Sequence, residues 1–124
     1  MEFSEHKNIF LQIGDWVYEQ ILDGRLKPGD KLPSVRELAV ELEVNRNTAM
    51  RTYQVLEEQG ILENKRGIGF YVSDTAPKVI LHRQKKEFFA QELPLLIQKA
   101  KLLKLTTEDL QELILTIQQN DHEN

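Results

Sequence analysis

The apolar residues at the start of the chain recur at helical spacing. Every fourth residue from Ile9 to Ile21 is apolar, so these side chains share one face of a helix. The pattern predicts a helix over residues 8–26. Gly24 and the turn residues that begin at Pro28 are typical of its end.

Two shorter helices are predicted next. Ser34 followed by Glu37 has the spacing of a capping box, which predicts a helix from Ser34 to about Glu43. Asn45 is a favourable cap for a third helix, and Gly60 is typical of its end. The apolar spacing of this third helix predicts an inner face of Ala49, Thr52, Tyr53 and Leu56.

A β-hairpin is predicted directly after the third helix. Residues 61–63 and 70–72 favour strands, and residues 64–69 have turn chemistry. Residues 74–77 are typical of a linker. The predicted fold is therefore mainly α with a small β-hairpin: a winged helix-turn-helix domain over residues 8–74.

The rest of the chain, residues 78–119, has the pattern of two long helices that form a C-terminal dimerisation segment. Pro94 predicts a kink or break near Leu93, and Thr106 with Asp109 predicts the start of the last helix. The apolar residues are more than two helices can bury alone, so we expect a homodimer. The predicted dimer residues are Phe89, Leu93, Leu96, Ala100, Leu103, Leu110, Ile114 and Ile117.

The apolar stretch that begins at Phe88 and Phe89 has two interpretations. It could line a ligand pocket, or it could belong to the dimer core. We favour the dimer core, because two helices per chain leave little volume after packing. The sequence leaves open whether a small-molecule effector exists.

Composition and charge limit the function. The 124 residues carry a net charge of −4 and contain no cysteine, which excludes disulfides and thiolate chemistry. The first 75 residues hold 9 basic and 13 acidic residues. Any DNA contact must therefore come from a local basic patch.

The sequence predicts a cytoplasmic protein that does not span a membrane. No apolar stretch approaches the roughly 20 residues that a spanning helix needs. Residues 1–5 lack the pattern of a signal peptide. His6, His82 and His122 lack metal-ligand spacing, so we expect no metal site and no cofactor.

The chemistry that fits DNA lies on the side of the third helix opposite its inner face. Arginine can hold guanine with two hydrogen bonds, asparagine and glutamine can do the same for adenine, and methionine can contact a thymine methyl group. The candidate residues on this helix are Arg46, Asn47, Met50, Arg51 and Gln54. Arg46 could instead hold a phosphate.

Two neighbouring elements add to this candidate surface. The helix that begins at Ser34 presents free amides that suit phosphate, and Arg36 lies in its first turn. The tip of the hairpin is basic and slim enough for a minor groove, with Lys65, Arg66 and Gly67.

Residues 9–72 resemble the winged helix of the GntR family of bacterial transcription regulators. The resemblance runs through residues 24–34, 36–39, 44–49 and 60–72, and covers about half the chain. It implies that DNA is contacted by Arg36, Arg46, Asn47, Thr48 and Gly67. Some relatives carry a contacting arginine where this chain has Met50, which leaves open whether the neighbouring Arg51 replaces it.

The length of the C-terminal part points to a branch of this family. Roughly 48 residues follow the hairpin and its linker, enough for two helices. This resembles the short YtrA-like branch, whose C-terminal helices dimerise and whose members often sit beside transporter operons. We expect a homodimer to bind a pseudo-palindromic DNA operator, because it presents two recognition helices to successive faces of the major groove. We favour a repressor over an activator, because blocking a promoter needs no further partner surface.

Two other interpretations remain open. A winged helix can also serve as a protein-interaction module without operator binding. The start of the C-terminal part also carries a basic cluster, made of Lys78, His82, Arg83, Lys85 and Lys86. This cluster could be a solvated helix face or could contact DNA that flanks the operator. An enzyme is not expected, because no nucleophile or acid–base arrangement is present.

Overall fold

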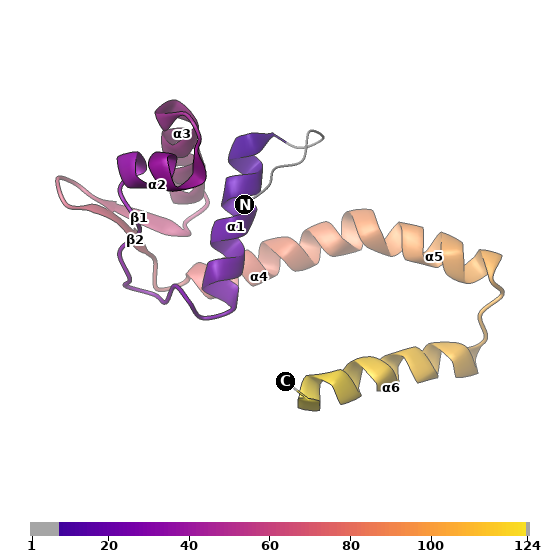
Figure 1. The fold of residues 1–124 in the computed structure, drawn as a ribbon. Coiled ribbons are helices and arrows are strands. Elements are labelled where there is room, and N and C mark those ends of the chain that lie inside the picture. Colours follow the sequence, from indigo (N-terminus) through magenta and orange to yellow (C-terminus); the bar gives the residue numbers. More distant parts are fainter. Residues whose placement is uncertain (1–7, 124) are drawn as a thin grey trace. The chain divides into compact units, whose positions relative to one another are not determined.

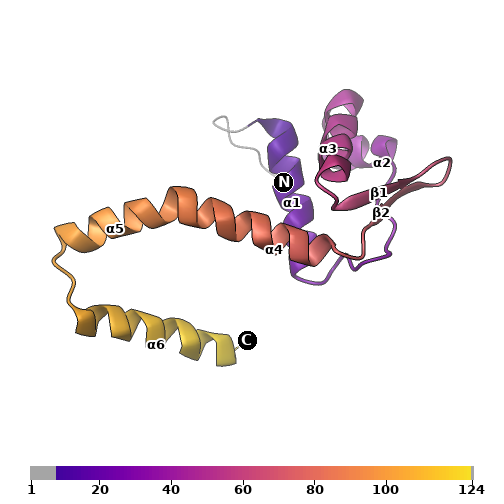
Figure 2. The same cartoon turned by 180° about the vertical axis from the view of Figure 1, so that it is seen from behind.

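The computed structural model describes residues 8–123, and side-chain burial is described for residues 8–120. The chain forms two compact units that divide after Gln84. The first unit contains the first three helices of the chain, a two-stranded hairpin and most of a fourth helix (Figures 1 and 2). This arrangement confirms the predicted fold class, mainly α with a winged helix-turn-helix.

The first unit is built on α1 (Ile9–Leu22), α2 (Val35–Leu42) and α3 (Arg46–Glu58). Both α1 and α2 pack against α3. The predicted inner face of α3 is confirmed, because its buried residues are Ala49, Thr52, Tyr53 and Leu56. α1 ends at Leu22, earlier than the predicted residue 26, and Gly24 follows it with a φ of +85°.

The starts of α2 and α3 are confirmed by their caps. The Ser34 hydroxyl accepts a hydrogen bond from the backbone N–H of Glu37 at 3.1 Å. The Asn45 side chain accepts one from the backbone N–H of Asn47 at 2.8 Å. These bonds satisfy amides that have no partner within their helices.

The hairpin, which is the wing of the fold, consists of β1 (Leu62–Lys65) and β2 (Gly69–Val72), which pair antiparallel. β1 lies later than the predicted strand at 61–63. Lys65, predicted in the turn, pairs with Gly69. The strand is longer because hydrogen bonding across the hairpin outweighs the turn propensity of these residues.

The linker predicted at residues 74–77 is wrong. Helix α4 (Ala76–Glu87) begins inside it, and Ala76 and Ile80 are fully buried in the core of the first unit. Pro77 does not prevent this, since proline is tolerated in the first turn of a helix. The first unit therefore runs on to Gln84 rather than ending at residue 74.

The second unit contains a π-helical turn, η1 (Phe88–Glu92), followed by α5 (Leu93–Leu102) and α6 (Thr107–Glu123). The predicted kink or break near Leu93 takes the form of a change of helix type: the π-helical turn η1 joins α4 to α5 without a non-helical residue between them. Proline has no N–H to donate to the preceding turn, and the wider turn accommodates Pro94. The start of α6 is also confirmed, because Thr106 and Asp109 cap each other reciprocally.

The apolar side chains of the second unit are largely exposed. Phe88 and Phe89 stack edge to face with their ring centroids 5.6 Å apart, and both remain accessible. The predicted dimer residues that are exposed are Phe89, Leu96, Leu103, Leu110, Ile114 and Ile117; Leu93 and Ala100 are half-buried. Across residues 8–123, no helix combines the length and apolar character needed to cross a membrane.

Candidate nucleic-acid interface

The outward side of α3 displays the residues predicted to read bases. Arg46, Asn47 and Gln54 are exposed, and Met50 keeps 39% of its surface accessible. Thr48 is half-buried, and its carbonyl accepts a hydrogen bond from the Thr52 hydroxyl at 2.9 Å. The exposed set combines one arginine, two amides and one thioether on a single helix, which are groups that match base edges.

Arg51 differs from its neighbours because it contacts α1. Its guanidinium carbon lies 4.3 Å from the centroid of the Phe10 ring, a cation–π contact. Phe10 has a second contact with α3, because the Thr52 hydroxyl donates a hydrogen bond to the Phe10 carbonyl oxygen at 3.3 Å. The contact with Phe10 joins α3 to α1, while the Arg51 side chain remains exposed.

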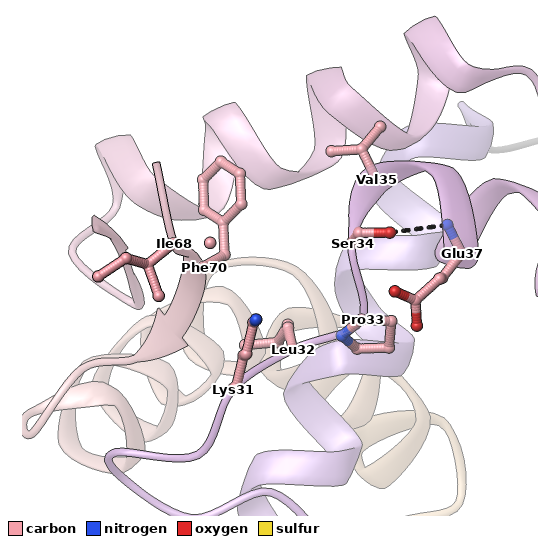
Figure 3. A pocket seen from close by; sticks show the side chains of 9 residues that line it. Lys31, Leu32, Pro33, Ser34, Val35, Glu37, Ile68 and Phe70 are labelled. Atoms are coloured by element: carbon pink, nitrogen blue, oxygen red, sulfur yellow. Dashed lines mark hydrogen bonds between the residues drawn. The ribbon is translucent and has the colours of Figure 1, made fainter. Parts of the chain in front are cut away.

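The start of α2 and the turn end of the hairpin share a surface hollow. Ser34 and Glu37 line it from α2, and Ile68 and Gly69 line it from the hairpin (Figure 3). Arg36, in the first turn of α2, is exposed. The structure therefore brings the predicted phosphate-binding helix start beside the wing.

Lys31 belongs to this hollow and was missed by the sequence analysis. It lies between the wing and the start of α2 in Figure 3, and it forms a β-bridge with Tyr71. A Cβ added at Gly69 would lie 3.0 Å from its side-chain Cε, so the glycine lets the lysine pass close to the wing backbone. Gly69, whose φ of +139° lies in the region that favours glycine, was the one sign in the sequence that another side chain could pass close to the backbone here.

The two basic residues of the wing differ in their surroundings. The Lys65 ammonium lies 4.2 Å from the centroid of the Tyr71 ring, which holds it on the hairpin. Arg66 and Gly67 are exposed at the turn. Gly67 has a φ of +80°, in the region that favours glycine, and open space surrounds its missing Cβ.

A buried tyrosine joins the two helices of the helix-turn-helix. The Tyr53 hydroxyl donates a hydrogen bond to the carbonyl oxygen of Pro33 at 2.6 Å, just before the cap of α2. Its ring is fully buried and lies against Phe70 of the wing, with centroids 4.9 Å apart. Tyr53 therefore fixes α2, α3 and the wing relative to one another.

We expect Tyr53→Phe to destabilise the protein by about 1 kcal/mol at neutral pH, because it removes this hydrogen bond. Burial, with smaller contributions from Glu37 and Glu41, raises the pKa of Tyr53. An unfolded tyrosine ionises near pH 10, so this contribution is complete below about pH 10 and is lost as the pH rises further. Urea unfolding at several pH values measures it.

The difference in unfolding free energy between the native chain and Tyr53→Phe should shrink above about pH 10, since ionisation then favours the unfolded tyrosine. Every other ionisable group is the same in both proteins, so its effect cancels in the difference. A difference that stays constant over the whole pH range would contradict this role of Tyr53.

The described part of the chain holds no group of three or more histidine, aspartate or glutamate side chains that could hold a metal ion. His6 lies outside the described residues, and so does the side chain of His122. What the arrangement offers is a set of exposed hydrogen-bonding groups on α3 flanked by positive charge on α2 and the wing.

Comparison with known families identifies this half of the chain. Residues 10–72 match the family described as bacterial regulatory proteins, gntR family. The HTH-type transcriptional regulator YhcF of Bacillus subtilis (strain 168) is 39% identical over 115 residues, which cover 93% of each chain. The HTH-type transcriptional repressor YtrA of the same organism is 42% identical over 106 residues, 86% of this chain and 81% of that protein.

Solved structures agree with these matches. A transcriptional regulator of the GntR family from Bacteroides thetaiotaomicron superposes with a TM-score of 0.77 at 33% identity, covering 92% of this chain and 99% of that one. The AraR DNA-binding domain in complex with operator ORR3 gives a TM-score of 0.53 at 27% identity, covering 59% and 86% respectively.

Proposed function

Because the chain belongs to the GntR family of bacterial regulatory proteins, we propose that it represses transcription by binding a double-stranded DNA operator as a homodimer. Family membership makes it a DNA-binding transcription regulator of the short YtrA-like kind and not an enzyme. Operator binding, the homodimer and the control of particular genes are what we propose beyond family membership.

The outward face of α3 carries this proposal. Arg46, Asn47, Met50 and Gln54 are accessible there, whereas the opposite face is buried. In a helix-turn-helix the second helix enters the major groove with its first turns against base edges. We assign guanine recognition to Arg46 and adenine recognition to Asn47 or Gln54.

The elements beside α3 supply the proposed phosphate contacts. Ser34 and Arg36 lie at the start of α2, where the helix dipole favours an anion. Lys31 adds a positive charge from the hollow beside them. Lys65 and Arg66 with Gly67 would contact the DNA backbone or the minor groove from the wing.

The exposed apolar residues of α5 and α6 support the homodimer. A soluble chain rarely leaves so many large apolar side chains accessible unless another surface covers them. A symmetric dimer would present its two copies of α3 about 34 Å apart, on successive turns of the major groove. The preferred operator would then be pseudo-palindromic.

Repression requires only that the bound dimer cover a promoter. The similarity to YtrA, which is named a repressor, favours repression over activation. The resemblance to the YtrA-like branch extends the proposal to control of a neighbouring transporter operon. The genes that flank this one in its genome test that extension directly.

We expect the protein to bind random duplex DNA with steep salt dependence, which fluorescence anisotropy measures. A protein that neutralises 6–10 phosphates loses about a thousandfold or more in affinity between 50 and 200 mM salt. Selection from a randomised duplex library should then yield a two-fold symmetric sequence. Arg25→Ala is the control, since this exposed arginine pairs with Asp23 outside the three DNA-facing elements.

The competing interpretation, a winged helix that serves as a protein-interaction module, predicts a different result. Such a module would bind random DNA weakly, with little dependence on salt, and selection would enrich no sequence. That outcome would contradict the proposed operator binding.

A further inference from the structure

Phe10 and Arg51 connect the beginning of α1 with the middle of α3. The Arg51 guanidinium carbon lies 4.3 Å from the centroid of the Phe10 ring, and the Thr52 hydroxyl donates a hydrogen bond to the Phe10 carbonyl oxygen. The first contact needs the Phe10 side chain, whereas the second needs only its backbone. A substitution at Phe10 can therefore remove the ring beside Arg51 and keep the hydrogen bond between the two helices.

The Phe10 ring contributes little to the core. Phe10 is half-buried. Among the residues that the structure describes, the partly buried apolar side chains packed against the core include the neighbouring Ile9 but not Phe10. The ring therefore serves mainly as the surface over which the Arg51 guanidinium lies.

Arg51 keeps the properties of a binding group in this contact. The residue is exposed. A guanidinium that lies over a ring keeps its N–H donors at the edge of its plane, where they can reach an acceptor. A free arginine side chain loses rotamer freedom when a ligand holds it. The contact with Phe10 restricts Arg51 beforehand, so less entropy is lost on binding.

The position of Arg51 indicates which acceptor it suits. Helical spacing places Arg51 beside Asn47 and Gln54 on the outward face of α3, and its guanidinium leans toward α1. A helix with its side chains nearly fills the major groove, so a side chain on its flank meets the sugar–phosphate wall and not the base edges. A phosphate can accept two parallel hydrogen bonds from arginine.

Arg51 lies on the side of α3 away from the wing. In both views, α3 stands between α1 and the hairpin (Figures 1 and 2), and it packs against both elements. We propose that Phe10 is a positioning residue, which holds Arg51 ready for a backbone phosphate on the α1 side of the major groove. This inference rests on the proposed operator binding. It adds a phosphate contact opposite those assigned to the wing.

Arg51→Gln tests the phosphate contact. Each neutralised phosphate contributes about 0.9 to the salt slope, so we expect the slope to fall by about one per half-site and the affinity at about 100 mM salt to fall about eightfold per half-site. The loss should be equal on the operator and on random duplexes. Arg25→Gln, which removes the same charge from an arginine paired with Asp23, is the control. A loss confined to one base position would contradict the phosphate assignment.

Phe10→Leu separates positioning from charge. The charge is unchanged, so the salt slope should stay as in the native chain, while the affinity falls about two- to tenfold because a freed side chain must now be ordered on the DNA. In the Arg51→Gln chain the same substitution should change the affinity by less than about twofold, since the group that Phe10 positions is gone. Phe10→Tyr, which keeps a ring, should bind as the native chain does.

Two further measurements distinguish this role from a purely structural one. Nuclear magnetic resonance of the free protein should show the Arg51 Cδ protons shifted upfield by the Phe10 ring, and Phe10→Leu should abolish the shift. Urea unfolding of each variant checks that it remains folded. A structural role alone predicts lower stability with unchanged DNA affinity, and that result would overturn the inference.

The outcomes also separate this inference from the proposed function. A native chain without salt-dependent DNA binding would contradict operator binding and the inference together. Native binding that Arg51→Gln leaves unchanged would contradict the inference alone. An equal loss from Phe10→Leu with and without Arg51 would show that Phe10 acts on DNA binding by another route.

Discussion

Ile114→Lys is expected to convert the proposed dimer into a monomer. Ile114 lies on the face of α6 that carries Leu110 and Ile117, and 54% of its surface is accessible in the single chain. In a dimer this face would be covered, and an ammonium group buried there without a partner would cost several kcal/mol. Multi-angle light scattering measures the mass of each variant.

Leu115→Lys is the matched control for this substitution. Leu115 is the next residue, and its accessible fraction of 57% is nearly the same. It lies about 100° further around the helix, away from the predicted dimer residues. The two variants have the same added charge and nearly the same exposure, so a difference between them reports the face and not the residue type.

The loss of the dimer should also weaken operator binding. Linking two DNA-binding units makes the second contact intramolecular, which raises the overall affinity by about 10² to 10⁴. Ile114→Lys should lose that factor on a two-site operator and keep the affinity of the native chain for a single half-site. If both lysine variants remain dimeric, α6 does not form the interface.

The parts of the fold that sequence predicted well are those governed by local chemistry. Ser34 and Asn45 mark helix starts because their side chains reach amides only two or three residues away. Thr106 and Asp109 do the same for α6. Gly67 supplies a positive φ that the tight turn requires. Such signals need no knowledge of the rest of the molecule.

The parts that sequence missed depend on residues far apart in the chain. Ala76 and Pro77 have the composition of a linker, and only the burial of Ala76 and Ile80 against the other helices shows that α4 begins there. Arg51 lies on the outward side of α3 by helical spacing, yet its guanidinium packs on Phe10, 41 positions earlier. No local pattern reports contacts of this kind.

The sequence named most of the residues of the candidate interface, but it did not predict how those residues are arranged in space. The residues of α3 follow from helical spacing once the inner face is known. The hollow beside the wing was not predictable, because it forms only when residues 29–32 pair with β2. That pairing places Lys31 in the same hollow as Ser34. It therefore adds a positive charge to the candidate interface of a chain whose net charge of −4 opposes DNA binding.

Arg46→Ala is expected to lower operator affinity by about 1–3 kcal/mol per half-site and to relax the preference at one base position. Arg46 is exposed in the first turn of α3, where side chains of a recognition helix meet base edges. Binding to the operator, to its single-base variants and to random duplexes measures both effects. Arg25→Ala, which removes the same charge outside the interface, is the control.

Lys65→Ala is the comparison that shows whether Arg46→Ala has removed a base contact or a phosphate contact. Lys65 lies on the wing, stacked over Tyr71, where its ammonium suits a phosphate. Its removal should weaken binding to all sequences equally and reduce the salt slope by about one. A base-reading residue changes the ratio between sequences, whereas a phosphate contact changes only the common factor. If Arg46→Ala behaves as Lys65→Ala does, Arg46 is a phosphate clamp and the reading of bases passes to Asn47 or Gln54.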